Sequence, residues 1–274
     1  MKLQKSLLKG GLFILASVSS LLFELSGGDR MDILLLLKKM PLKLSHISSK
    51  LDFTVQETSR NVARLSEADL ILKDVDGVFH LTPYGEEALL QLSGFRFLFD
   101  NRVYFLNHSL GLLPRQFQSS IGMLEGCILA EDVMISFRNI EEMIAEAQER
   151  VWILTNQVLA STIPYLIQAI ERGVAFRLLM PKDFVPTQSI REIVDNPVFE
   201  RATRTQKLGC RFLGGFGAFL CLSEREVSAV GFPDLGGKFD YVGFKGDGGS
   251  VMDWANSLFV RYWSEASSQV PDQL

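Results

Sequence analysis

The stretch TVQETSRNVARLSEADL, which begins at Thr54, places the narrowest limits on what this chain can fold into. Thr54 followed by Glu57 is a capping box, in which the hydroxyl and the carboxylate each satisfy a backbone N–H group of the first helical turn. At 3.6 residues per turn, Val55, Val62 and Leu65 fall near one side. We therefore predict a helix with one side in a core and a polar, basic side free to meet a partner.

The segments that flank this helix predict a helix-turn-helix with a β-hairpin. Upstream, residues 42–53 fit a shorter helix that ends in a turn at Asp52 and Phe53, and two helices joined by a tight turn are typical of this motif. Downstream, residues 70–82 fit two short strands around Asp76-Gly77, a dipeptide that hairpin loops favour because it tolerates positive φ. This hairpin is the expected wing.

The polar side chains of these elements are candidates for DNA contact. Gln and Asn can bond adenine edges, Arg can bond guanine with both arms, and Ser or Thr can hold phosphate oxygens. Lysines beside them can neutralise phosphates. The candidates are Lys50, Thr54, Gln56, Ser59, Arg60, Asn61, Arg64 and Lys73. An ordinary solvated helix face is the alternative, but the adjoining wing favours DNA.

Charge restricts DNA contact to the N-terminal part of the chain. Residues 1–93 hold 11 Lys and Arg and 11 Asp and Glu, whereas residues 123–274 hold 14 and 20, a difference of −6. An acidic surface repels phosphates, so only the first part is a plausible DNA contact. The modest basic charge supports an alternative function, a winged-helix module that binds proteins without DNA sequence specificity.

Length and pattern predict an α+β chain with two domains. At 274 residues with 47% hydrophobic content, the chain can form two cores. We expect a winged helix-turn-helix domain with an N-terminal helix at 1–93, a helical connector at 94–122, and an α/β domain at 123–274. The aromatic-rich connector is expected to pack between domains or across a dimer.

The third segment alternates strands with helices, which predicts a mostly parallel or mixed sheet. Strands are predicted at 126–130, 151–155, 175–180, 211–213, 218–222 and 227–232, and helices at 133–150, 163–172, 192–203 and 250–266. Ligand sites in such sheets favour the loops at the carboxyl ends of strands. The candidate ligand residues there are Thr155, Asn156, Gln157, Phe232, Asp234 and Asp240. The alternative is that Asn156 caps a helix and residues 234–237 only form a turn.

The first 26 residues superficially resemble a secretory signal, because three lysines precede an apolar run. The run is too short to span a bilayer, serines interrupt it and no A-x-A cleavage site follows. We expect a helix that packs on the winged domain or on a second subunit.

Cysteine usage favours a reducing, cytoplasmic location. Cys127, Cys210 and Cys221 are far apart and form no C-x-x-C pair, and the histidines are not near them. Each cysteine is best interpreted as a small core residue. No cofactor and no metal site is expected.

Two groups of motifs carry a family resemblance. Ser59, Arg60, Leu65, the LTPYG stretch at 81–85 and the wing together resemble archaeal and bacterial winged-helix regulators. VWILTNQVLASTIPYLIQAIERGVAFRLLMPKD resembles the phospholipase-D-like fold used as a sensor domain in archaeal regulators. From about Leu21 to Ala266, the chain resembles the archaeal methanogenesis regulatory protein family and its TrmB-like relatives. The resemblance implies a transcription regulator that binds DNA as a homodimer and senses a small-molecule effector.

The phospholipase-D-like resemblance also raises a phosphodiesterase hypothesis, which the residues argue against. Those enzymes need H-x-K-x(4)-D, with His as nucleophile, and superposing that motif strand puts Gly217, Phe219 and Glu224 at the three positions. The chain's histidines, none of which begins H-x-K, are His46, His80 and His108. A Ser-His-Asp triad lacks its G-x-S-x-G motif and any histidine in the third segment. We therefore expect no enzymatic activity.

Overall fold

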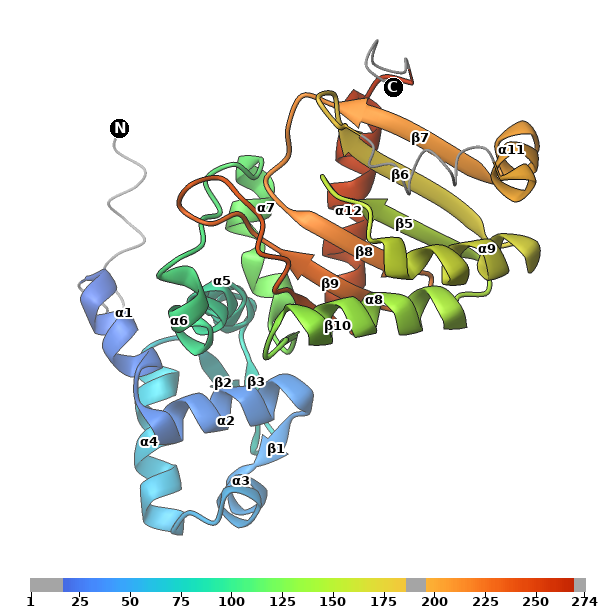
Figure 1. The fold of residues 1–274 in the computed structure, drawn as a ribbon. Coiled ribbons are helices and arrows are strands. Elements are labelled where there is room, and N and C mark those ends of the chain that lie inside the picture. The colour runs from blue at the N-terminus through green and yellow to red at the C-terminus, as the bar shows by residue number, and fades with distance from the viewer. Residues whose placement is uncertain (1–16, 186–195, 269–274) are drawn as a thin grey trace, which may run out of the picture. The chain divides into compact units, whose positions relative to one another are not determined.

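The computed structural model of the chain describes residues 17–185 and 196–268. Contacts among them divide the chain into two compact units, residues 1–92 and residues 93–274, called here the N-terminal and C-terminal units. Figure 1 labels their elements. Each unit has its own hydrophobic core.

The N-terminal unit is a winged helix-turn-helix. Its elements are α1 (Val18–Leu25), α2 (Gly28–Lys39), β1 (Leu42–Lys43), α3 (Leu44–Leu51), α4 (Val55–Glu67), β2 (Ile71–Lys73) and β3 (Val78–Leu81). The strands form an antiparallel sheet in the order β1-β3-β2. Ile33, Leu34, Ile47 and Leu65 are buried at its centre. The predicted α+β class and winged helix are confirmed.

Local chemistry sets the two turns of this unit. Asp52 ends α3 in the left-handed region, with φ of 55°, and the Ser48 hydroxyl donates to the Phe53 carbonyl at 2.8 Å. In the wing, Gly77 takes φ of 79°, as its place after Asp76 predicts. The wing loop holds four residues, Asp74 to Gly77, and Asp74 N–H closes it by donating to the Val78 carbonyl at 2.9 Å.

A Thr-Pro-x-Gly sequence starts α5 (Pro83–Asp100). The Thr82 hydroxyl accepts from Gly85 N–H at 2.9 Å and donates to the Asp69 carbonyl at 2.6 Å. A Cβ on Gly85 would lie 2.1 Å from the Leu70 carbonyl oxygen, so glycine is required there. Helix α5 continues to residue 100, across the boundary between the two units.

The C-terminal unit is built on a seven-stranded mixed sheet. Its elements, after the end of α5, are α6 (Arg102–Phe105), α7 (Arg115–Ser119), η1 (Ile121–Leu124), β4 (Ile128–Leu129), α8 (Val133–Glu146), β5 (Arg150–Leu154), η2 (Ala160–Thr162), α9 (Ile163–Glu171), β6 (Ala175–Pro181), α11 (Pro197–Arg204), β7 (Leu208–Leu213), β8 (Phe219–Ser223), β9 (Val227–Gly231), β10 (Phe244–Gly246) and α12 (Gly249–Glu265). The strand order is β4-β10-β9-β8-β5-β6-β7. Strands β5, β6 and β7 are parallel, and the other pairs are antiparallel.

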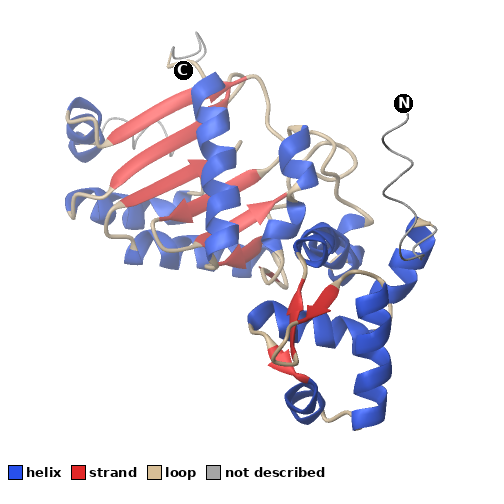
Figure 2. Ribbon diagram, turned by 180° about the vertical axis from the view of Figure 1, so that it is seen from behind, coloured by secondary structure: helices blue, strands red, loops and turns tan. Residues whose placement is uncertain are grey.

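Helices cover both faces of this sheet. In Figure 1, α8 and α9 lie over one face, and Figure 2 shows α12 along the other. Alternate strand residues separate the two cores: Val151 and Ile153 face the side of α8 and α9, while Leu154 faces the side of α12. The segment expected as a connector lies in the α12 core, where Phe97, Phe117 and other members are buried. It therefore belongs to the C-terminal unit.

No helix among the described residues has both the length and the apolar character needed to cross a membrane. The expectation of a helix over residues 1–26 is met only from Val18 onward, because residues 1–16 lie outside the described part of the chain.

Candidate nucleic-acid interface and ligand pocket

Helix α4 begins at a fixed point. The Thr54 hydroxyl accepts from Glu57 N–H at 3.2 Å and donates to Glu57 Oε2 at 2.7 Å, and Oε2 also accepts from Thr54 N–H at 3.0 Å. The hydrogen bonds from Thr54 hold the pKa of the Glu57 carboxyl below its usual range. The predicted capping box is present. It fixes the first turn of the helix, which holds the candidate DNA contacts Thr54 and Gln56.

Six of the eight candidate contacts are exposed. They are Lys50 at the end of α3, Thr54, Gln56, Ser59 and Arg60 at the start of α4, and Lys73 in the wing. Lys73 Nζ lies 5.5 Å from the centre of the Phe79 ring, so its stem rests on the wing strand. The exposed side of α4 thus carries an amide, a hydroxyl and a guanidinium within its first two turns.

The expectation that Asn61 faces outward is wrong. Asn61 is 6% exposed, and its Nδ2 lies 3.5 Å from Asp29 Oδ2 on α2. Conversely, Val55, which the period placed inward, is 60% exposed. The buried residues of α4 are Thr58 and Asn61 together with Val62 and Leu65, which were predicted to face inward, and the helix contacts α2 and α3.

Arg64 is bound to the N-terminal helix rather than free. Its Nη2 and Nε donate to the two oxygens of Glu24 at 2.6 and 3.0 Å. The same carboxylate lies 3.1 Å from Arg30 Nε, and both guanidinium groups rest over the Phe23 ring. Hydrogen bonding to Glu24 raises the pKa of Arg64. The sequence could not reveal Glu24 as the partner, because 40 residues separate it from Arg64.

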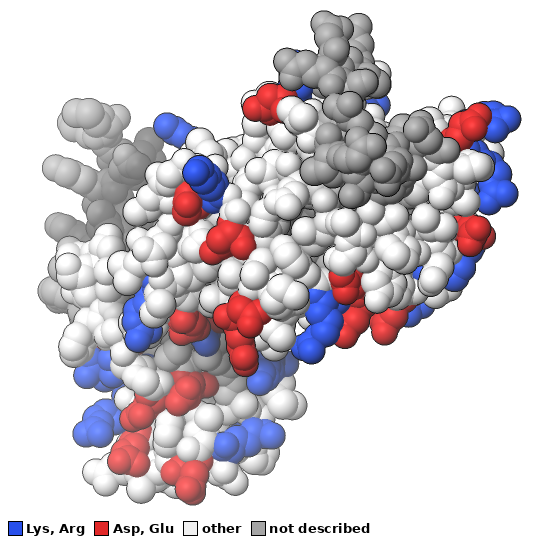
Figure 3. Space-filling model, viewed as in Figure 1, with Lys and Arg blue, Asp and Glu red and all other residues white. Residues whose placement is uncertain are grey.

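Charge around this surface is mixed. On the face shown in Figure 3, acidic and basic side chains alternate over the N-terminal unit. Within the described residues, Arg60 takes part in no ion pair at 4.0 Å or less, although its charge helps to lower the pKa of the Glu57 carboxyl. Arg60 is therefore the arginine of α4 that is available to a phosphate or a base.

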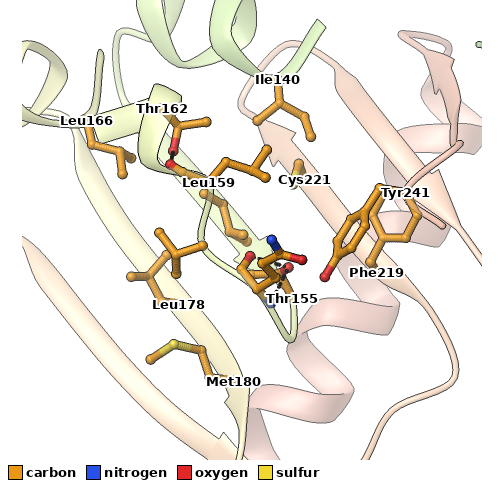
Figure 4. Close-up of a pocket in the computed structure, with 13 residues that line it drawn as sticks. Ile140, Thr155, Leu159, Thr162, Leu166, Leu178, Met180, Phe219, Cys221 and Tyr241 are labelled. Atoms are coloured by element: carbon orange, nitrogen blue, oxygen red, sulfur yellow. Dashed lines mark hydrogen bonds between the residues drawn. The ribbon is translucent and has the colours of Figure 1, made fainter. Parts of the chain in front are cut away.

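Three of the six candidate ligand residues lie at one pocket in the C-terminal unit. Thr155 and Gln157 line a cavity of about 50 Å³ at the carboxyl end of β5 (Figure 4). Asn156, between them, accepts a short hydrogen bond from the Tyr241 hydroxyl. Tyr241 also lines the cavity and was not among the predicted residues. It follows β9 in a long loop, but its residue type alone did not single it out.

The other three candidates do not reach this pocket. Phe232 is fully buried in the core on the α12 side of the sheet. Asp234 Oδ1 accepts from the N–H groups of Gly236 and Lys238, both at 2.8 Å, so it forms a turn as the alternative predicted. Asp240 Oδ2 lies 3.1 Å from His108 Nε2. The six candidates therefore do not form a single site.

The positions that correspond to a phosphodiesterase motif have packing roles. A Cβ on Gly217 would lie 2.4 Å from the Leu112 backbone, so a histidine does not fit there. Phe219 is 1% exposed. Glu224 accepts from the N–H groups of residues 148, 149 and 150 at 3.0 to 3.4 Å, which joins the α8–β5 turn to β8.

Comparison with known proteins adds a distant likeness. No family model and no curated protein sequence matches this chain. It is similar to the structure of TrmBL2, described as an archaeal chromatin protein with a novel mode of DNA binding, at 16% identity over 92% of this chain and 100% of that chain, with a TM-score of 0.43. It is also similar to Nuc of Salmonella typhimurium, a phospholipase D family member, at 9% identity over 46% and 86% of the two chains, with a TM-score of 0.34. Neither likeness is close enough to assign a function to this chain.

Proposed function

We propose that this protein is a transcription regulator that binds double-stranded DNA through its winged helix-turn-helix, with α4 as the recognition helix. The exposed start of α4 carries the proposal: Gln56, Ser59 and Arg60 project from a capped helix whose opposite side is buried. Such a helix fits the major groove, where amide and guanidinium groups distinguish base edges. Lys50 precedes the turn before α4, and Lys73 lies in the wing that follows it. Both lysines are expected to contact phosphates.

The proposed interface is smaller than the sequence suggests. Asn61 is buried and Arg64 is engaged by Glu24, so neither belongs to it in this conformation. Thr54 contributes through its helix cap, because its hydroxyl is already bonded to Glu57. Gln56 and Arg60 are the side chains assigned to base edges, and Ser59 is assigned to a phosphate oxygen.

We further propose that the protein acts as a homodimer whose C-terminal unit responds to a small molecule. Winged-helix dimers place two recognition helices about one turn of duplex apart, so the preferred site is a pseudo-palindrome. Helix α1 leaves Val18, Leu22 and Phe23 exposed, which supplies apolar area for a second subunit. Light scattering should then report twice the chain mass of 30.7 kDa.

Selection from a library of random duplexes tests the proposal. Enrichment of an inverted repeat, with an affinity that falls as salt rises, is the expected result, because each phosphate that the protein neutralises adds about 0.9 to the salt slope. Salt-dependent binding without enrichment of any sequence would show that the protein binds DNA nonspecifically. Failure to bind any duplex, or binding that is insensitive to salt, would contradict the proposal.

A protein-interaction module is the second candidate. Exposed Val55 next to Gln56 and the mixed charge of the unit favour it. In that case the same helix face docks on a protein groove, and the library selection recovers no sequence.

A further inference from the structure

We infer that the pocket beside β5 binds a small, uncharged organic molecule, which inserts a short aliphatic group and presents one polar group to Tyr241 and Asn156. The inference rests on the proposed ligand-responsive role of the C-terminal unit and names the chemical class of its ligand. The sequence alone indicates only Thr155 and Gln157 of this pocket, because the lining comes from three strands, the helices α8 and α9, the short helix η2 and two loops.

The lining determines the apolar part of the ligand. Strands β5, β6 and β8 supply the floor, and α8, η2 and α9 the walls (Figure 4). The aliphatic and aromatic members are Ile140, Ile153, Val158, Leu159, Leu166, Leu178, Met180 and Phe219. A single water needs roughly 10 to 15 Å³ of such space, and apolar cavities stay dry and take apolar ligands. A volume of about 50 Å³ therefore admits a short chain and excludes a ring system or a sugar.

The lining also excludes a charged ligand. No Asp, Glu, Lys, Arg or His is among the 13 lining residues, so a buried charge would have no partner. Burial raises the pKa of the Cys221 thiol to about 12, so this cysteine is a neutral wall at ordinary pH. The Thr155 and Thr162 hydroxyls already donate to the carbonyls of Gln157 and Leu159, at 2.8 and 2.7 Å. The remaining polar positions are the Tyr241 hydroxyl and the exposed amides of Asn156 and Gln157.

Tyr241 is held in an unfavourable backbone conformation at this position. Its φ is 63°, in the left-handed region that an aromatic residue rarely occupies. The centroid of its ring lies 5.3 Å from that of the Phe219 ring. The residues on either side of Tyr241 are also bonded to each other, because Asp240 Oδ1 accepts from Val242 N–H at 3.0 Å. Backbone strain that the surroundings maintain is concentrated at ligand-binding positions. Here it directs the hydroxyl to Asn156, at the polar end of the pocket.

Three probes of equal chain length test the ligand class: 1-pentanol, 1,5-pentanediol and pentylammonium. Methyl resonances of Ile153, Leu166 and Leu178 in the full-length protein report the pocket, and those of Leu222 and Leu258 report the other core. Saturable shifts confined to the first group are expected with 1-pentanol. The diol and the ammonium ion should bind about tenfold more weakly or not at all, because the diol buries a second hydroxyl without a partner and the ammonium ion meets no opposite charge in the lining. Equal binding of all three probes, or shifts in both cores, would overturn the inference.

Three variants test where the probe binds. Leu159→Trp fills the pocket from the residue before η2 and should abolish the shifts, while Leu235→Trp, at a side chain 75% exposed, should leave them unchanged. Tyr241→Phe keeps the ring and should weaken 1-pentanol binding by about fivefold through loss of the hydroxyl. Unchanged binding in Leu159→Trp would also overturn the inference.

Arg60→Ala separates this inference from the DNA proposal. The variant lies in the N-terminal unit, so its pocket shifts should equal those of the native chain whether or not it binds DNA. If a probe binds the pocket and the DNA affinity of the native chain does not change, only the proposal that the C-terminal unit responds to a small molecule is contradicted. Pocket shifts absent from a chain that binds DNA would contradict the inference alone.

Discussion

Arg64 Nη2 lies 2.6 Å from Glu24 Oε1, which joins the proposed recognition helix to the N-terminal helix α1. The carboxylate is 14% exposed and also holds Arg30, whose Nη2 donates to the Phe23 carbonyl at 2.7 Å at the end of α1. A single acidic side chain thus contacts arginines on two other helices and pairs with one that the sequence places among the candidate DNA contacts. Arg60, one turn earlier on α4, has no such partner within the described residues.

The Arg64–Glu24 pair should stabilise the N-terminal unit measurably. Both guanidinium nitrogens engage the carboxylate, so its geometry is better than that of a common surface pair. A double-mutant cycle of Arg64→Ala and Glu24→Gln, followed by urea unfolding, should give a coupling free energy of about 1 kcal/mol. A coupling near zero would show that the pair does not hold α1 to α4.

Gly85→Ala should strongly lower the free energy of unfolding of the N-terminal unit. The new Cβ would meet the Leu70 carbonyl oxygen at 2.1 Å, and backbone must shift to relieve it. We expect a loss of about 2 kcal/mol of unfolding free energy. Gly28→Ala is the matched control, because nothing lies within 4 Å of its Cβ and alanine favours the helix. Equal effects of the two substitutions would refute the packing argument.

Tyr104→Phe should destabilise the C-terminal unit. The Tyr104 hydroxyl accepts from Phe232 N–H at 2.8 Å and donates to the Phe232 carbonyl at 3.3 Å, within a buried cluster. Removing it leaves a buried N–H without a partner, at a cost of about 2 kcal/mol. Thermal unfolding beside Tyr84→Phe, at a residue 46% exposed, measures the difference. A Tyr104 effect no larger than that of Tyr84 would contradict this account.

The helix cap makes the stability of the N-terminal unit depend on pH. Because the pKa of Glu57 is lowered by its bonds from Thr54, its carboxylate stabilises the folded state above the unfolded pKa. That contribution is lost as pH falls through the lowered folded pKa. Unfolding free energy measured between pH about 5 and about 3 should therefore fall less in Glu57→Gln than in the native chain. Parallel curves for the two proteins would exclude this role.

Sequence pattern predicted the elements of the N-terminal unit better than the faces of its helices. The buried positions of α4 follow i, i+3, i+4 and i+7 from Thr58 to Leu65. Because Thr58 and Asn61 are polar, the hydrophobic pattern of the sequence did not mark them as buried. Thr58 is tolerated inside because its hydroxyl donates to the Thr54 carbonyl at 2.9 Å. Val55 lies in the first turn, beyond the reach of the core, which hydrophobicity alone does not reveal.

Long-range pairing explains the misses in the C-terminal unit. Strand β10 has three residues and no alternating pattern, and only its pairing with β9 and β4 makes it a strand. The pocket could not be assembled from sequence for the same reason. Its predicted part, Thr155 to Gln157, follows a strand directly, whereas Tyr241 arrives by a loop with φ of 63° that its residue type disfavours.

Fluorescence anisotropy with the duplex selected from the random library tests whether α4 is the recognition helix. Native protein, Arg60→Ala and Arg138→Ala should be titrated side by side at two salt concentrations. Arg138 is the matched control, an exposed arginine on α8 in the C-terminal unit. We expect Arg60→Ala to lose about tenfold in affinity and Arg138→Ala to keep the native affinity. Native affinity in Arg60→Ala, or an equal loss in both variants, would contradict the assignment of α4 as the recognition helix.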